Sequence, residues 1–310
     1  YSAAGGGVLI ALMALFKTYL GSIIDDKVWK GLAEGLNYGF GFMVIFMLHF
    51  TVATKQPAMT AARFAEAVEK NPQGKTLNMK LAQLLVDVFR SQSVAVLGNV
   101  VVAMGLAALI AFVYQHQTGE PLMNSEKIAY QLHRIDPLDG SLWFAAIAGV
   151  WLFCSGIISG YFDNRSNYLN MRMRLAQHPL LKKLMSEKSR VKFANYMHEN
   201  YGSLIGNFCF GMLLGLTGLV GYLTHLPLDI RHVAFSSANL GYSAVSGQFA
   251  YPFFLQCIAF VLLIGLVNLM VSFSLTLWVA LRSLNTEIES WWAIWHEVCQ
   301  IVKKLSLIHI

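Results

Sequence analysis

Long apolar runs separated by polar connections dominate the chain. A transmembrane helix needs about 20 consecutive apolar residues, and six stretches approach that length, although the first contains Lys17. We predict transmembrane helices over residues 6–24, 35–54, 93–114, 141–162, 203–224 and 253–281. The pattern therefore predicts an all-α fold, a polytopic transmembrane helical bundle of about six spans, with residues 1–304 as a single transmembrane domain.

Three connections between these runs have helical patterns of their own. Residues 55–92 indicate two amphipathic helices, separated by the turn signal NPQG at 71–74. Residues 163–202 indicate basic helices interrupted near His178. Residues 227–243 are mildly apolar and too short to cross a bilayer with ease, so we expect a re-entrant or surface helix there.

Composition and charge agree with a membrane protein. Hydrophobic residues make up 56% of the chain and charged residues 13%, against roughly 25% charged in soluble domains. Lys and Arg number six in 55–92 and eight in 163–202, but two, two and one in 25–34, 115–140 and 225–252. Positive residues are retained on the cytoplasmic side. We therefore predict a multi-pass protein of the bacterial inner membrane, with both termini of this sequence cytoplasmic.

The predicted partners follow from the same pattern. The bilayer itself is one, and basic residues near its surface attract anionic lipids. Because topology alone explains the surplus of positive charge, which is +6 overall, DNA is not an expected partner. Glycines at four-residue spacing let helix backbones approach in lipid, which predicts tight packing within the chain or, alternatively, a homo-oligomer. The pairs are Gly35 and Gly39, Gly156 and Gly160, Gly202 and Gly206, and Gly211 and Gly215.

Polar residues within the spans must find partners at membrane depth. They are Asn37, His49, Asn99, Asn207, Asn268, Ser272 and Ser274. They form hydrogen bonds between packed helices or, together, line a substrate or ion pathway. The predicted spans contain no acidic residue of the kind that a proton relay usually needs, which favours packing.

Three short polar segments are candidate functional sites. Two of them, residues 51–60 and 160–165, lie at the predicted cytoplasmic exits of the second and fourth spans. Asp163 is a candidate partner for Lys55 or Arg165, and the alternative is that these residues only anchor the helix ends. The third is the segment 227–243. With two amides inside the spans, the candidate functional residues are Lys55, Gln56, Asp163, Asn164, Arg165, Asn207, Asp229, Arg231, His232, Asn239 and Asn268.

Motifs of soluble enzymes are absent from the sequence. It contains no HExxH, GxxxxGK[ST], GxSxG or Gly-rich dinucleotide turn. Its four cysteines, Cys154, Cys209, Cys257 and Cys299, form no CxxC pair, and no histidine has metal-ligand spacing with a second ligand. We therefore predict no catalytic residue, no cofactor and no metal site.

Five segments carry a resemblance to a known family. They are ATKQPAMT (53–60), SGYFDNR (159–165), GNFCFG (206–211), PLDIRHVAFSSANLGYS (227–243) and GLVNLMVSFSLTLWVALR (265–282). On them the chain resembles a proteobacterial family known as site-specific recombinases, after a gonococcal member, over residues up to about 282. Full-length members carry a long helical, mainly soluble region ahead of the membrane part, so we expect a portion upstream of Tyr1. The last residues, LSLIHI (305–310), resemble a translated sequencing adapter, and we expect them not to be native.

The family name implies DNA strand exchange. Tyrosine recombinases group an Arg, a His-x-x-Arg and a Tyr nucleophile, but this sequence contains no His-x-x-Arg. No resolvase-like soluble domain, which a serine recombinase needs, is visible either. The leading prediction is thus a non-enzymatic role in transport, lipid handling or sensing, with a small molecule or lipid as substrate. The alternatives are a membrane-tethered DNA recombination protein and a scaffold for partner proteins.

Overall fold

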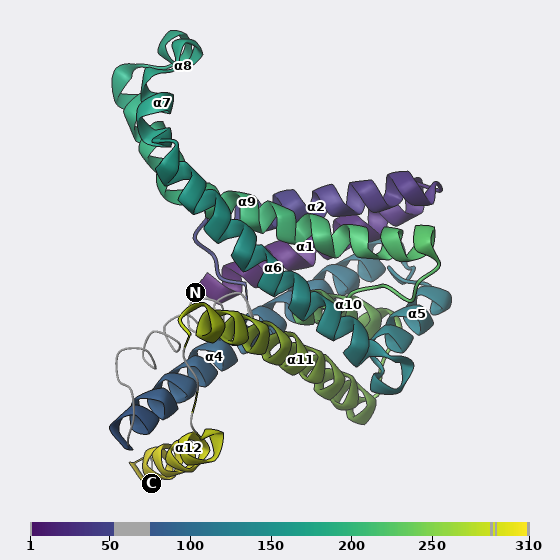
Figure 1. The fold of residues 1–310 in the computed structure, drawn as a ribbon. Helices are drawn as coiled ribbons and strands as arrows, with labels where there is room; N and C mark the ends of the chain where they lie inside the picture. The colour runs from purple at the N-terminus through teal and green to yellow at the C-terminus, as the bar shows by residue number, and fades with distance from the viewer. Residues whose placement is uncertain (1, 53–74, 286–287, 289, 309–310) are drawn as a thin grey trace. The chain divides into compact units, whose positions relative to one another are not determined.

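Helices form almost the whole described chain (Figure 1). The computed structural model describes residues 2–52, 75–285, 288 and 290–308, and no strand occurs among them. The all-α prediction is therefore confirmed. In chain order the elements are α1 Ser2–Ile23, α2 Lys27–Met47, α4 Lys75–Thr118, α5 Ser125–Ile135, the 3-10 helix η1 Pro137–Asp139, α6 Ser141–Tyr168, α7 Met171–Gln177, α8 Pro179–Leu184, α9 Glu187–Thr224, α10 Val233–Ser246, α11 Tyr251–Ser283 and α12 Trp291–Ile308.

Several of these helices have the length and composition of membrane spans. Within the described residues there are five, in α1, α4, α6, α9 and α11, which is consistent with the predicted bundle of about six. The helix α2 holds most of the second predicted span. It begins eight residues before the start of the predicted span 35–54 and ends seven residues before the end of that span. It is less apolar than the five spanning helices because it includes Lys30, Glu34 and Asn37.

Two of the helices are much longer than a bilayer requires. With 44 and 38 residues, α4 and α9 extend about 66 and 57 Å at 1.5 Å per residue, against a hydrocarbon core of about 30 Å. The second half of the predicted connection 55–92 and the end of 163–202 are therefore continuations of spanning helices. The predicted break at 71–74 lies outside the described residues.

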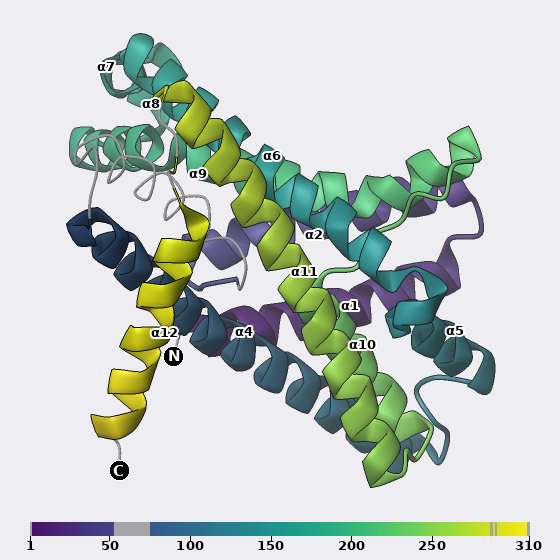
Figure 2. The ribbon, with the colours of Figure 1, turned by 60° about the horizontal axis from the view of Figure 1, so that its bottom comes forward.

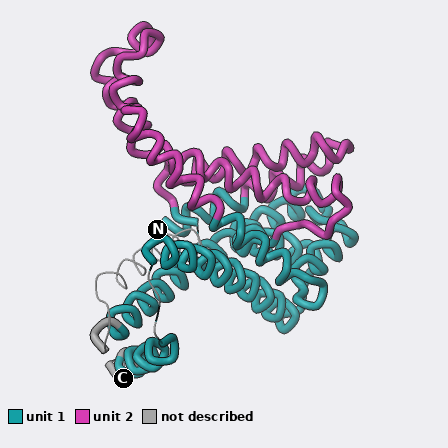
Figure 3. Tube along the Cα trace, in the orientation of Figure 1, with its two compact units in different colours: residues 1–11, 51–153, 231–310 teal, residues 12–50, 154–230 magenta. Residues whose placement is uncertain are grey.

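The chain forms two compact units, and neither is continuous in sequence (Figure 3). Unit 1 contains residues 1–11, 51–153 and 231–310, and unit 2 contains residues 12–50 and 154–230. The helices α1 and α6 contribute residues to both units. The single transmembrane domain over 1–304 stays a prediction.

In unit 1 the most buried element is α10. Ten of its 14 residues are buried, and it packs against α4, α5 and α11 (Figure 2). A Cβ at Gly241 would collide with the Met104 carbonyl, so glycine lets α10 approach α4 closely. The surrounding apolar side chains include Val100, Ile135, Ala145, Cys257, Val261 and Ile264. The segment predicted as a re-entrant or surface helix is thus an interior helix of its unit.

In unit 2 the helix α9 contacts α2 and α6 through separate glycine pairs. Cβ atoms at Gly211 and Gly215 would collide with the α2 backbone, and Cβ atoms at Gly202 and Gly206 would collide with Ser159 of α6. Four-residue glycine spacing therefore serves packing within the chain at these positions. In contrast, a Cβ at Gly160 would meet nothing within 4 Å. The homo-oligomer stays a prediction.

Candidate functional site

The helices α1 and α2 form an antiparallel hairpin within unit 2. Asp26 ends the turn as the N-cap of α2, because its carboxylate accepts hydrogen bonds of 2.9 Å from the backbone N–H groups of Val28 and Trp29. Away from this turn, Lys30 of α2 lies against Gly21 of α1, Glu34 lies against Lys17, and Asn37 lies against Met13, as an antiparallel pairing requires. The register of the hairpin is therefore set by the contacts of a few polar side chains.

The central contact of the hairpin is an ion pair. The Lys17 ammonium lies 3.0 Å from a Glu34 carboxylate oxygen, with 27% and 12% of the two side chains exposed. The same ammonium lies 5.5 Å from the centroid of the buried Tyr38 ring, near enough for a cation–π contact. A charge among apolar helices is expensive to desolvate and marks a functional site by default.

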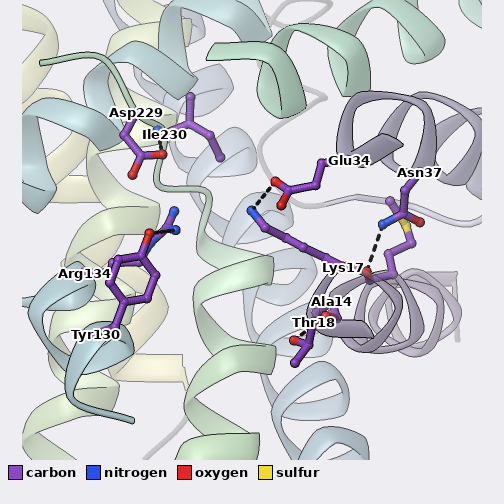
Figure 4. A network of polar contacts seen from close by, with 10 residues as sticks. Ala14, Lys17, Thr18, Glu34, Asn37, Tyr130, Arg134, Asp229 and Ile230 are labelled. Atoms are coloured by element: carbon purple, nitrogen blue, oxygen red, sulfur yellow. Dashed lines mark hydrogen bonds and ion pairs between the residues drawn. The ribbon is translucent and has the colours of Figure 1, made fainter. Parts of the chain in front are cut away.

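Polar groups continue from this ion pair into the hairpin (Figure 4). The Asn37 amide donates a hydrogen bond of 3.0 Å to the Met13 carbonyl of α1. Ten residues, or about 15 Å of helix, separate Lys27 from Asn37, and this is half the thickness of a hydrocarbon core of about 30 Å. Further in, Gly41 packs against the Met13 side chain. We call Lys17, Lys30, Glu34 and Asn37 the α1–α2 polar seam.

Sequence reasoning missed Glu34, which directly precedes the predicted span 35–54 and lies in α2, a helix outside the five candidate spans found among the described residues. The apolar run from residue 35 placed Glu34 just outside the predicted span, whereas α2 begins at Lys27. A readable signal was present. Asp25 and Asp26 favour a helix start, and an antiparallel return from that turn places Glu34 opposite Lys17.

The face of α2 beside the seam is fixed by α9. Cβ atoms at Gly31, Gly35 and Gly39 would meet Leu219, Leu216 and Phe208 of α9. Edge-to-face rings add to this contact, since Phe40 and Phe208 have centroids 5.2 Å apart. One side of α2 is thus held rigidly while another carries the seam.

A second polar group lies in unit 1, around Asn268 of α11. The Asn268 amide donates hydrogen bonds of 2.7 Å to the Ala145 carbonyl and 2.9 Å to the Arg231 carbonyl. Its oxygen accepts one of 3.1 Å from the backbone N–H of Val233, the first residue of α10. The side chain is fully buried. We call Arg231, His232 and Asn268 with these backbone partners the Asn268 node.

The other two side chains of the node are also buried. The Arg231 Nε donates to the Arg134 carbonyl at 2.7 Å, and the guanidinium lies 4.9 Å from the Phe144 ring centroid. His232 precedes α10, outside the spanning helices, and is 1% exposed. Burial lowers the pKa of its imidazole to about 4, so this side chain is neutral at neutral pH.

Asp163 and Arg165, at the end of α6, have different partners, and the alternative pairing of Asp163 with Lys55 lies outside the described residues. Asp163 accepts a hydrogen bond of 2.9 Å from the Gly202 backbone N–H, and the Arg165 guanidinium donates to the Tyr161 hydroxyl at 3.3 Å. Residues two apart on a helix face different directions, which explains the two partners. Asn164 is exposed. The structure supports helix-end anchoring by Asp163.

The remaining candidates are spread over the chain. Asn207 is buried on α9 and donates to the Ser203 carbonyl at 2.7 Å. The Asp229 carboxylate accepts from the neighbouring Ile230 N–H at 2.7 Å, and Asn239 is partly exposed on α10. Lys55 and Gln56 lie outside the described residues. Of the predicted residues, the structure brings Arg231, His232 and Asn268 together.

Comparison with known families gives one match. The family described as site-specific recombinase matches residues 1–308. The chain belongs to the site-specific recombinase family. The resemblance carried by the five sequence segments is thereby confirmed, and both the α1–α2 polar seam and the Asn268 node lie within the family match. Neither the curated proteins nor the solved structures contain a match to the chain.

Metal chemistry has no visible support in the part of this family member that the structure describes. No three His, Cys, Asp or Glu side chains lie together there in a way that could hold a metal ion. The sequence prediction that the protein has no metal and no cofactor stays a prediction. What the seam offers is a carboxylate and an ammonium held in contact among apolar helices.

Proposed function

We propose that this protein is a non-enzymatic transporter of the bacterial inner membrane that moves protons across it. The ion pair between Lys17 and Glu34 supports this proposal. A carboxylate and an ammonium held among apolar helices are the groups that proton relays use. Both ends of the sequence and the basic α7–α8 region then face the cytoplasm, where positive residues are retained.

The mechanism rests on how protonation changes the hairpin. When Glu34 takes up a proton it loses its charge, and the attraction that holds Lys17 at 3.0 Å disappears. The Lys17 ammonium and the neutral Glu34 carboxyl then no longer attract each other as opposite charges, which favours a different arrangement of the seam side chains. Proton movement then follows because the two arrangements of the seam, with Glu34 charged or neutral, hold different numbers of protons.

The test uses the purified chain in phospholipid vesicles that contain a pH-sensitive dye. A potassium gradient with valinomycin makes the interior negative, and the measured quantity is the rate of acidification. We expect a rate above that of empty vesicles, and a loss of about tenfold or more in Glu34→Gln, equivalent to about 1.4 kcal/mol. Glu126→Gln, at an exposed carboxylate of α5, is the matched control and keeps the rate.

Two results would contradict the proposal. One is acidification no faster than in empty vesicles, and the other is an unchanged rate in Glu34→Gln at equal protein density. Lys17→Met provides a further check, because it leaves Glu34 without its cationic partner. It should change the pH dependence of the rate.

The family description supports a second candidate function, a membrane-tethered DNA recombination protein. Such a protein binds duplex DNA through many phosphate contacts, so its affinity falls steeply as salt rises. Measurement of DNA binding by the purified chain at several salt concentrations separates the two candidates. Tight binding at physiological salt favours recombination, and weak binding with intact proton movement favours transport.

A further inference from the structure

The short helices α7 and α8 expose apolar side chains outside the spanning stretches. Leu184 is 80% exposed, Met173 and Leu180 are more than half exposed, and Tyr168, the last residue of α6, is 86% exposed. These residues follow the predicted span 141–162 and precede the predicted span 203–224. Their exposure therefore needs an explanation other than contact with the hydrocarbon core.

The same region is strongly basic. Residues 166–192 contain seven Lys and Arg and a single acidic residue, Glu187. Four of the basic side chains are on the two short helices themselves, and all are exposed: Arg172, Arg174, Lys182 and Lys183. Together with Met173, Leu180 and Leu184 they form what we call the α7–α8 tip.

The tip is held in place by α9, so its apolar side chains are not exposed through loose packing. The Arg190 Nε of α9 donates a hydrogen bond of 2.6 Å to the Ala176 carbonyl at the end of α7. At the end of α6, the buried Ser166 hydroxyl lies 3.1 Å from His198 Nδ1 of α9. The left-handed residue Asn170, with φ 46°, turns the chain into α7. The exposed face is thus a defined surface of unit 2.

We propose that the α7–α8 tip docks on anionic lipid headgroups of the membrane in which the protein sits. Basic side chains that alternate with aliphatic ones are typical of segments that lie in the membrane interface. Each Lys or Arg near an anionic surface contributes about 1 kcal/mol, and Leu180, Leu184 and Met173 enter the upper acyl region. Nucleic acid would also attract the charges, and Tyr168 beside the tip offers a ring for a base, but the apolar side chains of the tip itself, Met173, Leu180 and Leu184, offer none.

The experiment places an environment-sensitive fluorophore on the tip of the full chain. Leu184→Cys is labelled with a nitrobenzoxadiazole probe after Cys154, Cys209, Cys257 and Cys299 are replaced by serine. The protein is reconstituted in nanodiscs of phosphatidylcholine alone or with roughly one-third phosphatidylglycerol. We expect a blue shift and an emission increase of about twofold or more with the anionic lipid. High salt should reduce both, because it screens the charges.

Two matched variants define the cause of that response. Replacement of Arg172, Arg174, Lys182 and Lys183 by glutamine should abolish the dependence on anionic lipid. The control probe is at Leu138, which is 95% exposed in η1 between Asp136 and Asp139. It should give the same spectrum in both nanodiscs, because its surroundings are acidic.

Identical Leu184 spectra in the two nanodiscs would overturn the proposal. A response to added duplex DNA in phosphatidylcholine nanodiscs, without a response to phosphatidylglycerol, would overturn it in favour of a nucleic-acid partner. The four-glutamine variant must remain monodisperse and keep the helix content of the parent protein, which shows that it is folded. Failure of lipid docking leaves the proposed transport untouched, since the seam and the tip are assayed separately.

Discussion

The α1–α2 polar seam and the Asn268 node both place polar side chains among apolar helices, but they satisfy them differently. In the node a neutral amide forms three hydrogen bonds to backbone groups and is fully buried. In the seam two charged side chains face each other, and both are partly exposed. The ion pair of the seam is an interaction that a single proton can remove.

This difference suggests a structural role for the Asn268 node and a functional role for the α1–α2 polar seam. Asn268 joins the Ala145 carbonyl of α6 to the segment that leads into α10, where the Val233 N–H, at the first position of that helix, has no partner within the helix. The pair of Lys17 and Glu34 joins two side chains that could each move. We therefore expect node variants to change stability and seam variants to change proton movement.

The largest effect is expected for Asn268→Ala. It leaves the Ala145 and Arg231 carbonyls and the Val233 N–H buried without this partner, at about 1–3 kcal/mol for each group. The free energy of unfolding in detergent should fall by about 3 kcal/mol or more. Asn164→Ala, at an exposed site, should change it by less than about 0.5 kcal/mol. A stable Asn268→Ala protein would show that the node is not structural.

The dependence of protein stability on pH tests whether His232 of the node is buried from solvent. In the unfolded chain His232 binds a proton below its ordinary pKa of 6.5, but in the folded chain burial lowers the pKa to about 4. The unfolded state therefore binds more protons as pH falls from about 6.5 to about 4, and stability is lost across that window. The loss is about 2 kcal/mol near pH 5. Thermal unfolding against pH should show it in the wild type and lack it in His232→Gln.

A smaller effect is expected where α9 supports the seam. Gly215→Ala pushes a Cβ into the α2 backbone and should lower stability by about 1–2 kcal/mol. Gly160→Ala, whose Cβ enters open space, should raise stability by about 0.5–1 kcal/mol. The two variants make the same chemical change on neighbouring helices of one unit. Equal effects on unfolding would mean that close approach of α2 and α9 does not matter.

The smallest effect on stability belongs to the ion pair itself. A double-mutant cycle with Lys17→Met and Glu34→Gln should give a coupling of about 1 kcal/mol or less, because both side chains are partly exposed. The same single variants should have the larger effect on vesicle acidification. A coupling of several kcal/mol with normal acidification would reverse the comparison between the seam and the node.

Much of the helical architecture could be predicted from apolar runs alone. The span at 141–162 lies within α6 and the span at 253–281 within α11, and the break near His178 separates α7 from α8 as predicted. The residues at which helices begin and end were harder to predict from apolar runs. A helix that leaves the bilayer continues with polar residues, so apolar runs underestimate the length of α4 and α9.

The sites were predictable only in part. Asn268 was recognisable as an amide in a span, but its partner Ala145 is 123 residues away, and no local pattern reveals such a contact. Glu34 was excluded by a span boundary that was set by hydropathy. Asp163 was selected for its charge, whereas its role depends on the close approach that Gly202 allows.

The two glycine pairs of α9 have a mechanical consequence. The five residues from Gly206 to Gly211 rotate the helix by about 140°, so the pairs face α6 and α2 in different directions. Movement of α9 along α6 is blocked by its contact with α2, and movement along α2 is blocked by its contact with α6. The helices α2, α6 and α9 therefore keep a fixed register. Of the two helices that carry the seam, α2 is the one that this register holds from the side of α9. A crosslink between α2 and α9 should therefore leave the proposed proton movement unchanged.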